Sequence, residues 1–440
     1  MKRWKLLFPA LVLALLLAGC EKKPREVENE PWTVRLDALT EASFTGTADP
    51  RDGTADGRLT GADSWRFEGT LRGEELLDGT CEALPCRLTV AGETFTGRYT
   101  GPIVGGLPEG EGTAELAGGT FTGTFAAGEL RDGEAASLPA DLRWCDSDYA
   151  GTYTGDLVGG LPEGEGVFEG KNAVGQSLCW NGGWAEGEPA GTGELLADRL
   201  LTMMEGQTCA GAYEGAGADG LPEGEGRFTS VSGEGEAFTY EGAWSAGAMD
   251  GQGALRYEGE NYYLRRGTFT AGCYTPTWME ALASLGTGEA KFELTPERIE
   301  FLNAHPELWE EEDHENFFYS RYVSDFDSRL TIWDCLHVDG AMDVPRWMRI
   351  YTLRVIRANV VRLSPAAPEM TVVTVSGGSY VDVVRLIIPQ RIDDLSRTQP
   401  IHVFAVPLAV SEYTTVLGET RPCLVMLAGD GYYGIQEKGE

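Results

Sequence analysis

A seven-residue segment, Gly-Leu-Pro-Glu-Gly-Glu-Gly, occurs three times in this chain and limits its fold more than any other feature. The copies begin at Gly106, Gly160 and Gly220, so they are 54 and 60 residues apart. Identical segments at a nearly constant spacing are typical of a repeat architecture, in which similar supersecondary units stack on one another. We therefore expect an array of stacked repeats.

An aromatic-x-Gly-x-aromatic pattern stands before each copy, as in Phe95 to Tyr99 and Tyr149 to Tyr153. The third example is incomplete, because Cys209 replaces its first aromatic residue. Alternation with period two places the rings and the glycine on one face of a β-strand. A glycine weakens a strand unless a nearby ring covers its bare backbone. Each unit is thus predicted to be a β-hairpin, which needs stacked neighbours for stability.

The segments Trp180 to Gly193 and Tyr240 to Gly253 resemble MORN repeats, whose pattern is Tyr-x-Gly-x-Trp/Tyr, then Gly, then Gly-x-Gly. Six good units lie between Phe95 and Gly253, and the resemblance covers roughly Phe44 to Cys273. It implies a mainly β fold with a MORN-type β-hairpin repeat array over residues 44–275. MORN arrays serve as scaffolds and binding surfaces, so the resemblance implies that kind of role.

The first 20 residues have the proportions of a signal peptide. Three basic residues among the first five are followed by an apolar run from Leu6 to Leu17, which is short for a membrane span. The run ends in Leu-Ala-Gly-Cys at Cys20, which resembles a bacterial lipobox. This resemblance implies lipidation of Cys20 and an extracytoplasmic protein anchored to the bacterial cell membrane by acyl chains. An ordinary secretory signal with a chance cysteine is the alternative.

The segment after the signal is charged and strongly acidic. Residues 21–43 are expected to form a tether, because Glu21 to Pro31 is charged and poor in apolar residues. From Pro24 to Ala290, 16 Lys and Arg oppose 45 Asp and Glu, a net charge of −29. Nucleic acids and anionic lipid head groups are bound through Lys and Arg, so the array is expected to bind neither. Solubility is the alternative reason for this charge.

Residues 276–343 are predicted to form a helical linker. Thr277 to Glu280 has the form of a capping box, and Gly286 suits the end of that helix. A second helix is expected from Thr295, an N-cap followed by proline, to about Ala304. The acidic residues 310–313 and Glu315 are interpreted as a solvated face.

Residues 344–434 are rich in β-branched residues and nearly neutral. They predict a small five-stranded barrel, with strands at 347–362, 370–376, 379–388, 401–407 and 422–428. The segments from Ile401 to Val406 and from Pro422 to Val425 resemble OB-like domains of bacterial envelope lipoproteins. OB barrels bind oligonucleotides or oligosaccharides across one face, although a fold by itself does not define a function.

No catalytic signature, metal-ligand spacing or cofactor motif is recognisable. Asp146 to Gly151 imitates the start of a calcium loop, but Leu157 stands where the closing glutamate should be. Eight cysteines remain besides Cys20, and both disulfides and buried free thiols are open to them. Cys81 and Cys86 are close enough in sequence to close a small loop. We expect no catalytic residue, no cofactor and no metal.

Three functions remain open. The first is a non-catalytic, lipid-anchored envelope protein that binds a protein or glycan partner, or acts as a scaffold, through its array. Its candidate binding surface is Tyr99, Tyr153, Trp184, Tyr213 and Trp244, which could equally be core aromatics of the array. The second is an envelope enzyme acting on glycans, with catalytic carboxylates in the acidic array. The third is a structural spacer for the C-terminal barrel.

Overall fold

The computed structural model describes residues 23–90, 92–116, 118–233, 235–258, 263–287, 290–305, 331–343, 348–376, 383–393, 395–397, 400–415 and 417–428. The signal segment with Cys20 and the acidic residues 310–313 and 315 lie outside the described residues. Contacts divide the chain into two units. Unit 1 comprises residues up to 174 and 180–191, and unit 2 comprises residues 175–179 and those from 192 onward.

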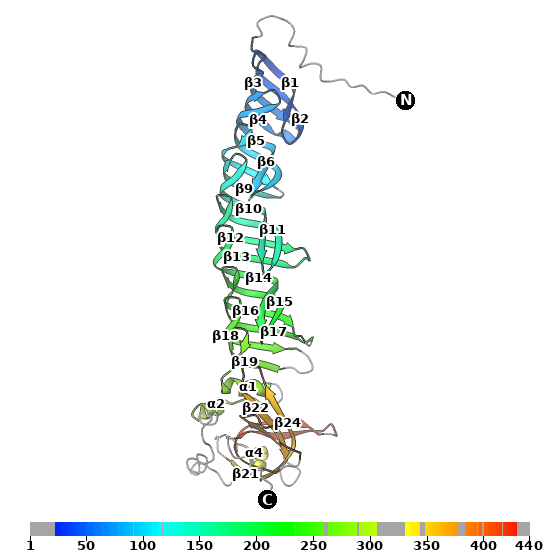
Figure 1. The fold of residues 1–440 in the computed structure, drawn as a ribbon, viewed down its shortest axis with the longest axis vertical. Coiled ribbons are helices and arrows are strands. Elements are labelled where there is room, and N and C mark those ends of the chain that lie inside the picture. The colour runs from blue at the N-terminus through cyan, green and yellow to red at the C-terminus, as the bar shows by residue number, and fades with distance from the viewer. Residues whose placement is uncertain are drawn as a thin grey trace, which may run out of the picture. The chain divides into compact units, whose positions relative to one another are not determined.

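Within each unit, the repeat array consists of antiparallel strands joined by tight turns, as the repeat pattern predicts (Figure 1). The array elements in chain order are β1 (Arg25–Arg35), β2 (Leu39–Asp49), β3 (Thr54–Gly61), the short helix η2 (Ala62–Ser64), β4 (Arg66–Arg72), β5 (Glu75–Val90), β6 (Glu93–Val104), β7 (Leu107–Pro108), β8 (Gly110–Leu116), β9 (Gly119–Ala126), β10 (Glu129–Trp144), β11 (Ser147–Val158), β12 (Leu161–Asn172), β13 (Ser177–Ala185), β14 (Glu188–Met204), β15 (Gln207–Ala218), β16 (Leu221–Val231), β17 (Ala237–Ser245), β18 (Ala248–Tyr257), β19 (Tyr263–Thr270) and β20 (Cys273–Tyr274).

The repeated glycines face one another across neighbouring strands. Gly155 of β11 pairs with Gly166 of β12, and Gly215 of β15 pairs with Gly226 of β16. The ring of Tyr153 fills the space above the first pair, because a Cβ at either glycine would meet its hydroxyl. This arrangement matches the prediction that a ring covers the bare backbone. The ring comes from the same strand, two residues before the glycine.

The array begins earlier than the sequence indicates. Residues 21–43 were expected to form a tether, but β1 pairs antiparallel with β2, with Trp32 opposite Ala42. The Trp32 ring packs on Phe44 with centroids 4.8 Å apart, and its indole N–H donates to the Gly73 carbonyl at 3.1 Å. These contacts extend the array to Arg25. A bulge and Pro31 interrupt β1, features that commonly protect an edge strand from further pairing.

The other end of the array is covered by a helix, α1 (Trp278–Thr287). The predicted capping box is present: the Thr277 amide donates to Glu280 at 2.8 Å, and the Glu280 amide donates to the Thr277 hydroxyl at 3.3 Å. Hydroxyl groups of α1 then bond to the edge strand β19. Ser284 Oγ accepts from the Arg266 amide at 3.0 Å, and Thr287 Oγ1 accepts from the Leu264 amide at 3.1 Å. These backbone amides are therefore not open to another strand.

In the rest of the described residues, the elements form a closed five-stranded barrel with two further helices. They are α2 (Pro296–Asn303), α4 (Ile332–His337), β21 (Met348–Arg362), β22 (Glu369–Ser376), β23 (Val383–Ile388), β24 (Pro400–Thr414) and β25 (Thr420–Ala428). The barrel order is β21-β22-β23-β25-β24, and β23 runs parallel to β25. The helix predicted from Thr295 is α2, with the Thr295 side chain accepting from the Arg298 amide and Ala304 as C-cap.

Alternate residues of the barrel strands belong to two separate apolar clusters. Val384, Leu386 and Ile388 of β23 lie in one cluster, which fills the barrel and includes Cys335 of α4. Ile387 stands between Leu386 and Ile388 in the strand, but it belongs to the other cluster, together with Ala281 and Leu282 of α1. Since neighbouring strand residues point to opposite faces, this second cluster lies on the outer face of the barrel. Helix α1 thus touches β19 with polar side chains and the barrel with apolar ones.

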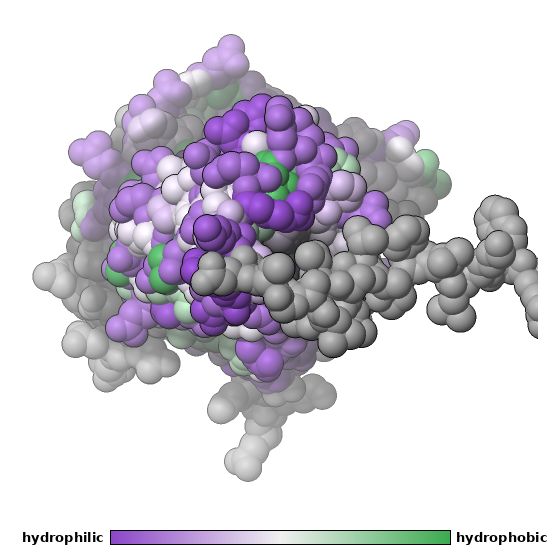
Figure 2. Space-filling model, turned by 90° about the horizontal axis from the view of Figure 1, so that it is seen from above, coloured by the Kyte–Doolittle hydropathy of each residue, from purple (hydrophilic) through white to green (hydrophobic). Residues whose placement is uncertain are grey.

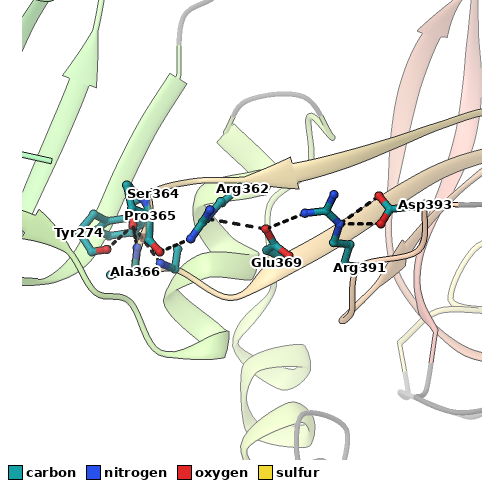
Figure 3. A network of polar contacts seen from close by, with 9 residues as sticks. Tyr274, Arg362, Ser364, Pro365, Ala366, Glu369, Arg391 and Asp393 are labelled. Carbon is teal, nitrogen blue, oxygen red and sulfur yellow. Dashed lines mark hydrogen bonds and ion pairs between the residues drawn. The ribbon is translucent and has the colours of Figure 1, made fainter. Parts of the chain in front are cut away.

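Polar contacts also join β20 to the barrel (Figure 3). Ser364 Oγ donates to the Tyr274 carbonyl, and the same hydroxyl accepts from the Ala367 amide at 3.0 Å. Arg362 Nη2, at the end of β21, donates to the carbonyl of Pro365 in the loop before β22 at 2.5 Å. An exposed chain of ion pairs continues from Arg362 through Glu369 to Arg391.

Candidate functional site

The five predicted binding-surface aromatics all lie inside the array. Their exposed fractions are 0% for Tyr99, 2% for Tyr153, 4% for Trp184, 2% for Tyr213 and 2% for Trp244. The structure therefore places them in the core, as the alternative interpretation has it, because they stack on rings that lie two strands further along the array. Tyr153 meets Trp184 edge to face at 5.2 Å, and Tyr213 meets Trp244 in the same way at 5.1 Å.

Three tyrosine hydroxyls share a recurring backbone partner, whereas the buried Tyr99 hydroxyl has none among the described residues. Tyr153 donates to the carbonyl of Asp156 at 3.0 Å, Tyr213 to that of Ala216 at 2.6 Å, and Tyr240 to that of Ala243 at 2.9 Å. Burial raises the pKa of Tyr153 to about 12. Each of these hydroxyls bonds to the carbonyl three residues later, so it holds the strand shape and is not presented to a ligand.

The buried indole N–H groups differ from these three hydroxyls in that not all of them have a hydrogen-bond acceptor. Trp180 Nε1 donates to the Gly183 carbonyl at 3.0 Å. Trp184 Nε1 and Trp244 Nε1 are buried, and no acceptor lies within hydrogen-bond distance of either one in the described part of the chain. An unpaired buried donor is unusual, because most buried polar side-chain atoms in folded proteins have a partner.

Each copy of the repeated segment Gly-Leu-Pro-Glu-Gly-Glu-Gly is called a heptad. The first glutamate of each heptad accepts a hydrogen bond from a backbone amide in the turn of the following hairpin. Glu163 Oε2 accepts from the Glu186 amide at 3.0 Å, while the neighbouring Pro162 carbonyl accepts from the Gly187 amide at 3.0 Å. Glu109 and Glu223 make the same bond to their turns, at 2.7 and 2.8 Å. Part of the acidity of the array is thus structural, and these carboxylates are already used as hydrogen-bond acceptors.

The surface of the molecule is mainly polar where it can be seen. Figure 2 shows hydrophilic residues over most of the coloured face, with small, separate hydrophobic spots. Within the described ranges, no group of three or more His, Cys, Asp or Glu side chains is placed to hold a metal ion. The helices that the structure describes are all too short or too polar to cross a membrane.

Two cavities open at the heptads of unit 1, and the sequence pattern alone did not reveal them. One, of about 120 Å³, is lined by Tyr153 and Trp184 together with Leu138, Leu157 and Pro162. The other, of about 450 Å³, is lined by Leu84, Ile103 and Pro108. These residues stand 54 positions before Leu138, Leu157 and Pro162. A signal was available: the dipeptides Leu84-Pro85 and Leu138-Pro139 recur at the heptad spacing.

Two of the cysteines lie on β5 in unit 1. Cys81 and Cys86, predicted to be near enough for a loop, both carry free thiols in the structure. Burial raises the pKa of Cys81 to about 11 and that of Cys86 to about 12. Since the thiolate is the nucleophile, neither thiol is activated at neutral pH.

Comparison with known families agrees with the geometry of the hairpins. The family model for the MORN repeat matches residues 153–172, 213–235 and 240–260. The chain contains MORN repeats. The matched segments hold the ring-over-glycine pairs of Tyr153, Tyr213 and Tyr240. No curated protein sequence matches the chain. The prediction of a mainly β fold with a MORN-type array and a small C-terminal barrel is confirmed.

Proposed function

We propose that this protein is a non-catalytic binding or scaffold module, anchored by lipid in the bacterial cell envelope on the extracytoplasmic side. The observation that carries the binding role is the MORN array, whose heptads open cavities edged by exposed aliphatic residues. MORN repeats suggest a binding or scaffold role. Glu109, Glu163 and Glu223 accept hydrogen bonds from turn amides, and this structural use of the repeated carboxylates favours the binding or scaffold role over glycan hydrolysis.

The anchor rests on the sequence of the first 20 residues, in which Cys20 follows Leu-Ala-Gly. Its lipid would hold the protein at a membrane, while the acidic array keeps it from anionic surfaces. Metabolic labelling with an alkyne fatty acid tests this point. The wild type and a Cys86→Ser control should be labelled, and Cys20→Ser should not. A labelled Cys20→Ser protein would exclude the lipid anchor at this position.

We further propose that the barrel is of the OB type and serves to close the array. Five strands in the order β21-β22-β23-β25-β24 support the OB assignment. OB barrels bind ligands on the outer face of their second and third strands. Met370, Val372 and Ile387 occupy that face here and pack against α1 and α2. This cover favours a capping role and disfavours nucleic acid as a partner.

A binding and turnover screen on the protein from Glu21 onward separates the three functions. Immobilised glycans and purified envelope proteins would be the probes, with released sugar measured in parallel. Saturable binding without turnover is the expected result. Turnover of a glycan would replace the proposal with the enzyme function. If neither binding nor turnover is detected, only the spacer function remains.

A further inference from the structure

A pair of exposed aliphatic side chains ends the hairpin of β11 and β12 in unit 1. Val158 stands directly opposite Leu161 in the strand register, and their exposed fractions are 56% and 41%. The turn between them is held in place, because the Gly159 amide donates to Asp132 Oδ1 on β10 at 2.7 Å. The pair therefore forms a fixed apolar tip that is open to solvent.

A row of carboxylates lies next to this tip. Glu134 of β10 stands opposite Asp156 of β11, and Asp156 stands opposite Glu163 of β12. Residues directly opposed on neighbouring strands have Cβ atoms roughly 5 Å apart, and like charges in such pairs are destabilising. Asp156 and Val158 are two residues apart, so they lie on the same face of the sheet. The aliphatic pair and the three carboxylates thus share one face.

The middle carboxylate is not required by the repeat. Glu163 accepts a hydrogen bond from the Glu186 amide, as the first glutamate of every heptad does for its own turn. Asp156, in contrast, has Pro102 at its position in the preceding repeat and Ala216 in the following one. A charge that costs stability and that the other repeats do without is expected at a functional site.

The protein itself does not neutralise this row. Within the described ranges, neither Glu134 nor Asp156 forms an ion pair with lysine or arginine, and Arg131 on β10 is paired with Glu129 at 2.5 Å. The net charge of −29 from Pro24 to Ala290 would repel a second copy of the chain. The described carboxylates are also not grouped so as to hold a metal ion. A cationic side chain from another protein is the complementary occupant.

The spacing of the two features fits a long basic side chain. Residues two apart on one face of a strand are separated by roughly 6.5 Å. Lysine and arginine lay an apolar stem along apolar surface and carry their charge at its end. Such a side chain can rest its stem on Leu161 and place its charge beside Asp156.

We propose that the face of β10, β11 and β12 that carries Val158, Leu161 and Asp156 binds a segment of a partner protein in which lysine or arginine stands beside aliphatic residues. This inference rests on the proposed binding function and names the class of partner. The aliphatic tip contributes apolar contact, and the carboxylate row selects for positive charge.

The test measures the fluorescence anisotropy of a dye-labelled peptide, Leu-Ser-Arg-Ser-Leu-Ser-Arg, with the full-length protein in non-ionic detergent. In the first control peptide serine replaces each leucine, and in the second glutamate replaces each arginine. We expect saturable binding of the first peptide that weakens as salt is added, because salt screens exposed charges. Each control peptide should bind roughly tenfold or more weakly, since it lacks one of the two contacts.

Two variants place the binding on this face. Asp156→Ala introduces the residue found at Ala216, and Val158→Ala introduces the one found at Ala218, so the repeat tolerates both. Each should weaken binding of the peptide roughly tenfold. Asp156→Ala should at the same time keep or raise the melting temperature, because it removes a like charge. Glu93→Ala, which removes an exposed carboxylate at the start of β6, is the matched control and should bind as the wild type does.

Equal affinity of Asp156→Ala and the wild type, or equal binding of the serine control peptide, would overturn this site. Asp156-dependent binding of calcium ions without binding of the peptide would assign the carboxylates to a metal instead. If the peptide fails but a purified envelope protein still binds saturably, the proposed function survives without this class of partner. If neither binds, both proposals fail.

Discussion

The ring of Tyr153 lies so close to Gly166 on the neighbouring strand that a Cβ at Gly166 would come nearer than 3.0 Å to it. The same relationship joins Tyr213 to Gly226. The Tyr153 hydroxyl reaches past the glycine to the Asp156 carbonyl. The glycine therefore makes room for the ring that covers two strands, which explains why ring and glycine recur together in the repeat.

Replacing Gly166 by alanine should destabilise the protein. The added methyl group must displace the Tyr153 ring, and overpacking of this kind costs about 1 to 3 kcal/mol. The matched control is Gly233→Ala, where a Cβ meets no atom within 4 Å. Urea denaturation followed by circular dichroism gives both free energies of unfolding. Equal values for Gly166→Ala and Gly233→Ala would show that the ring does not need the bare backbone.

The two glutamates of one heptad should differ in their contribution to stability. Glu163 accepts a hydrogen bond from the Glu186 amide, whereas Glu165 is exposed. Glu163→Ala should lower the free energy of unfolding by about 1 kcal/mol, the usual net value of such a bond. Glu165→Ala in the same heptad should leave it nearly unchanged. If both substitutions have the same effect in thermal melts, the carboxylate at 163 does not support the turn.

Much of the array could be predicted because its local pattern and its packing require the same residues. Tyr240, Gly242 and Gly253 occupy hairpin positions that the spacing alone defines. Strand β1 was missed, because Glu21 to Pro31 is charged and poor in apolar residues and so lacks the aromatic pattern of the repeat. Helix α4 was also missed, since six residues are too few to show a helical period.

The site was harder to predict than the fold. An alternating strand has the same sequence whether its aromatic face is exposed or buried by the next turn of the array. Only the stacked structure shows that Tyr99 and Tyr153 are interior. The cavity beside Trp184 depends on how side chains from several distant strands fail to fill one space, which no local pattern encodes.

Alkaline pH should unfold the array. Burial raises the pKa of Tyr99, Tyr153 and Tyr274 to about 12, above the ordinary value of 10.0. Their neutral form is favoured in the fold, so their contribution to stability is complete below pH 10 and is lost as the pH rises toward 12. Tyrosinate absorbance should then rise together with the loss of β-sheet circular dichroism. Complete tyrosine ionisation in a protein that is still folded would contradict this coupling.

The α1 hydroxyl at position 284 should protect the edge of β19. Ser284 is buried and bonds to the Arg266 amide and to the Tyr274 hydroxyl. Ser284→Ala leaves that amide without a partner, which costs about 1 to 3 kcal/mol and opens the edge to self-association. Ala283→Ser, at an exposed position of the same helix, is the control. Sedimentation velocity and thermal melting measure both effects; a monomeric, fully stable Ser284→Ala protein would show that the edge needs no such cover.

The barrel should fold with its helices and fail without them. A fragment of residues 339–434 lacks α1 and α2, so it exposes the outer cluster that includes Met370, Val372 and Ile387. It also lacks α4, which contributes Cys335 to the inner cluster. Each large apolar side chain that loses its cover costs roughly 1.5 to 3 kcal/mol, and several of them together reach the typical net stability of about 5 to 15 kcal/mol.

A fragment of residues 275–434 keeps that cover. This longer fragment exposes the side of α1 that faces β19 in the full protein. That side carries Glu280, Ser284 and Thr287, whose polar groups water can solvate. We expect the longer fragment to be monomeric with a cooperative melt, and the shorter one to aggregate or remain unfolded. Cooperative melting of the shorter fragment would show that the barrel is independent, and that α1 belongs to the array alone. The apolar contacts of Ala281, Leu282 and Leu285 with barrel residues argue for the opposite result.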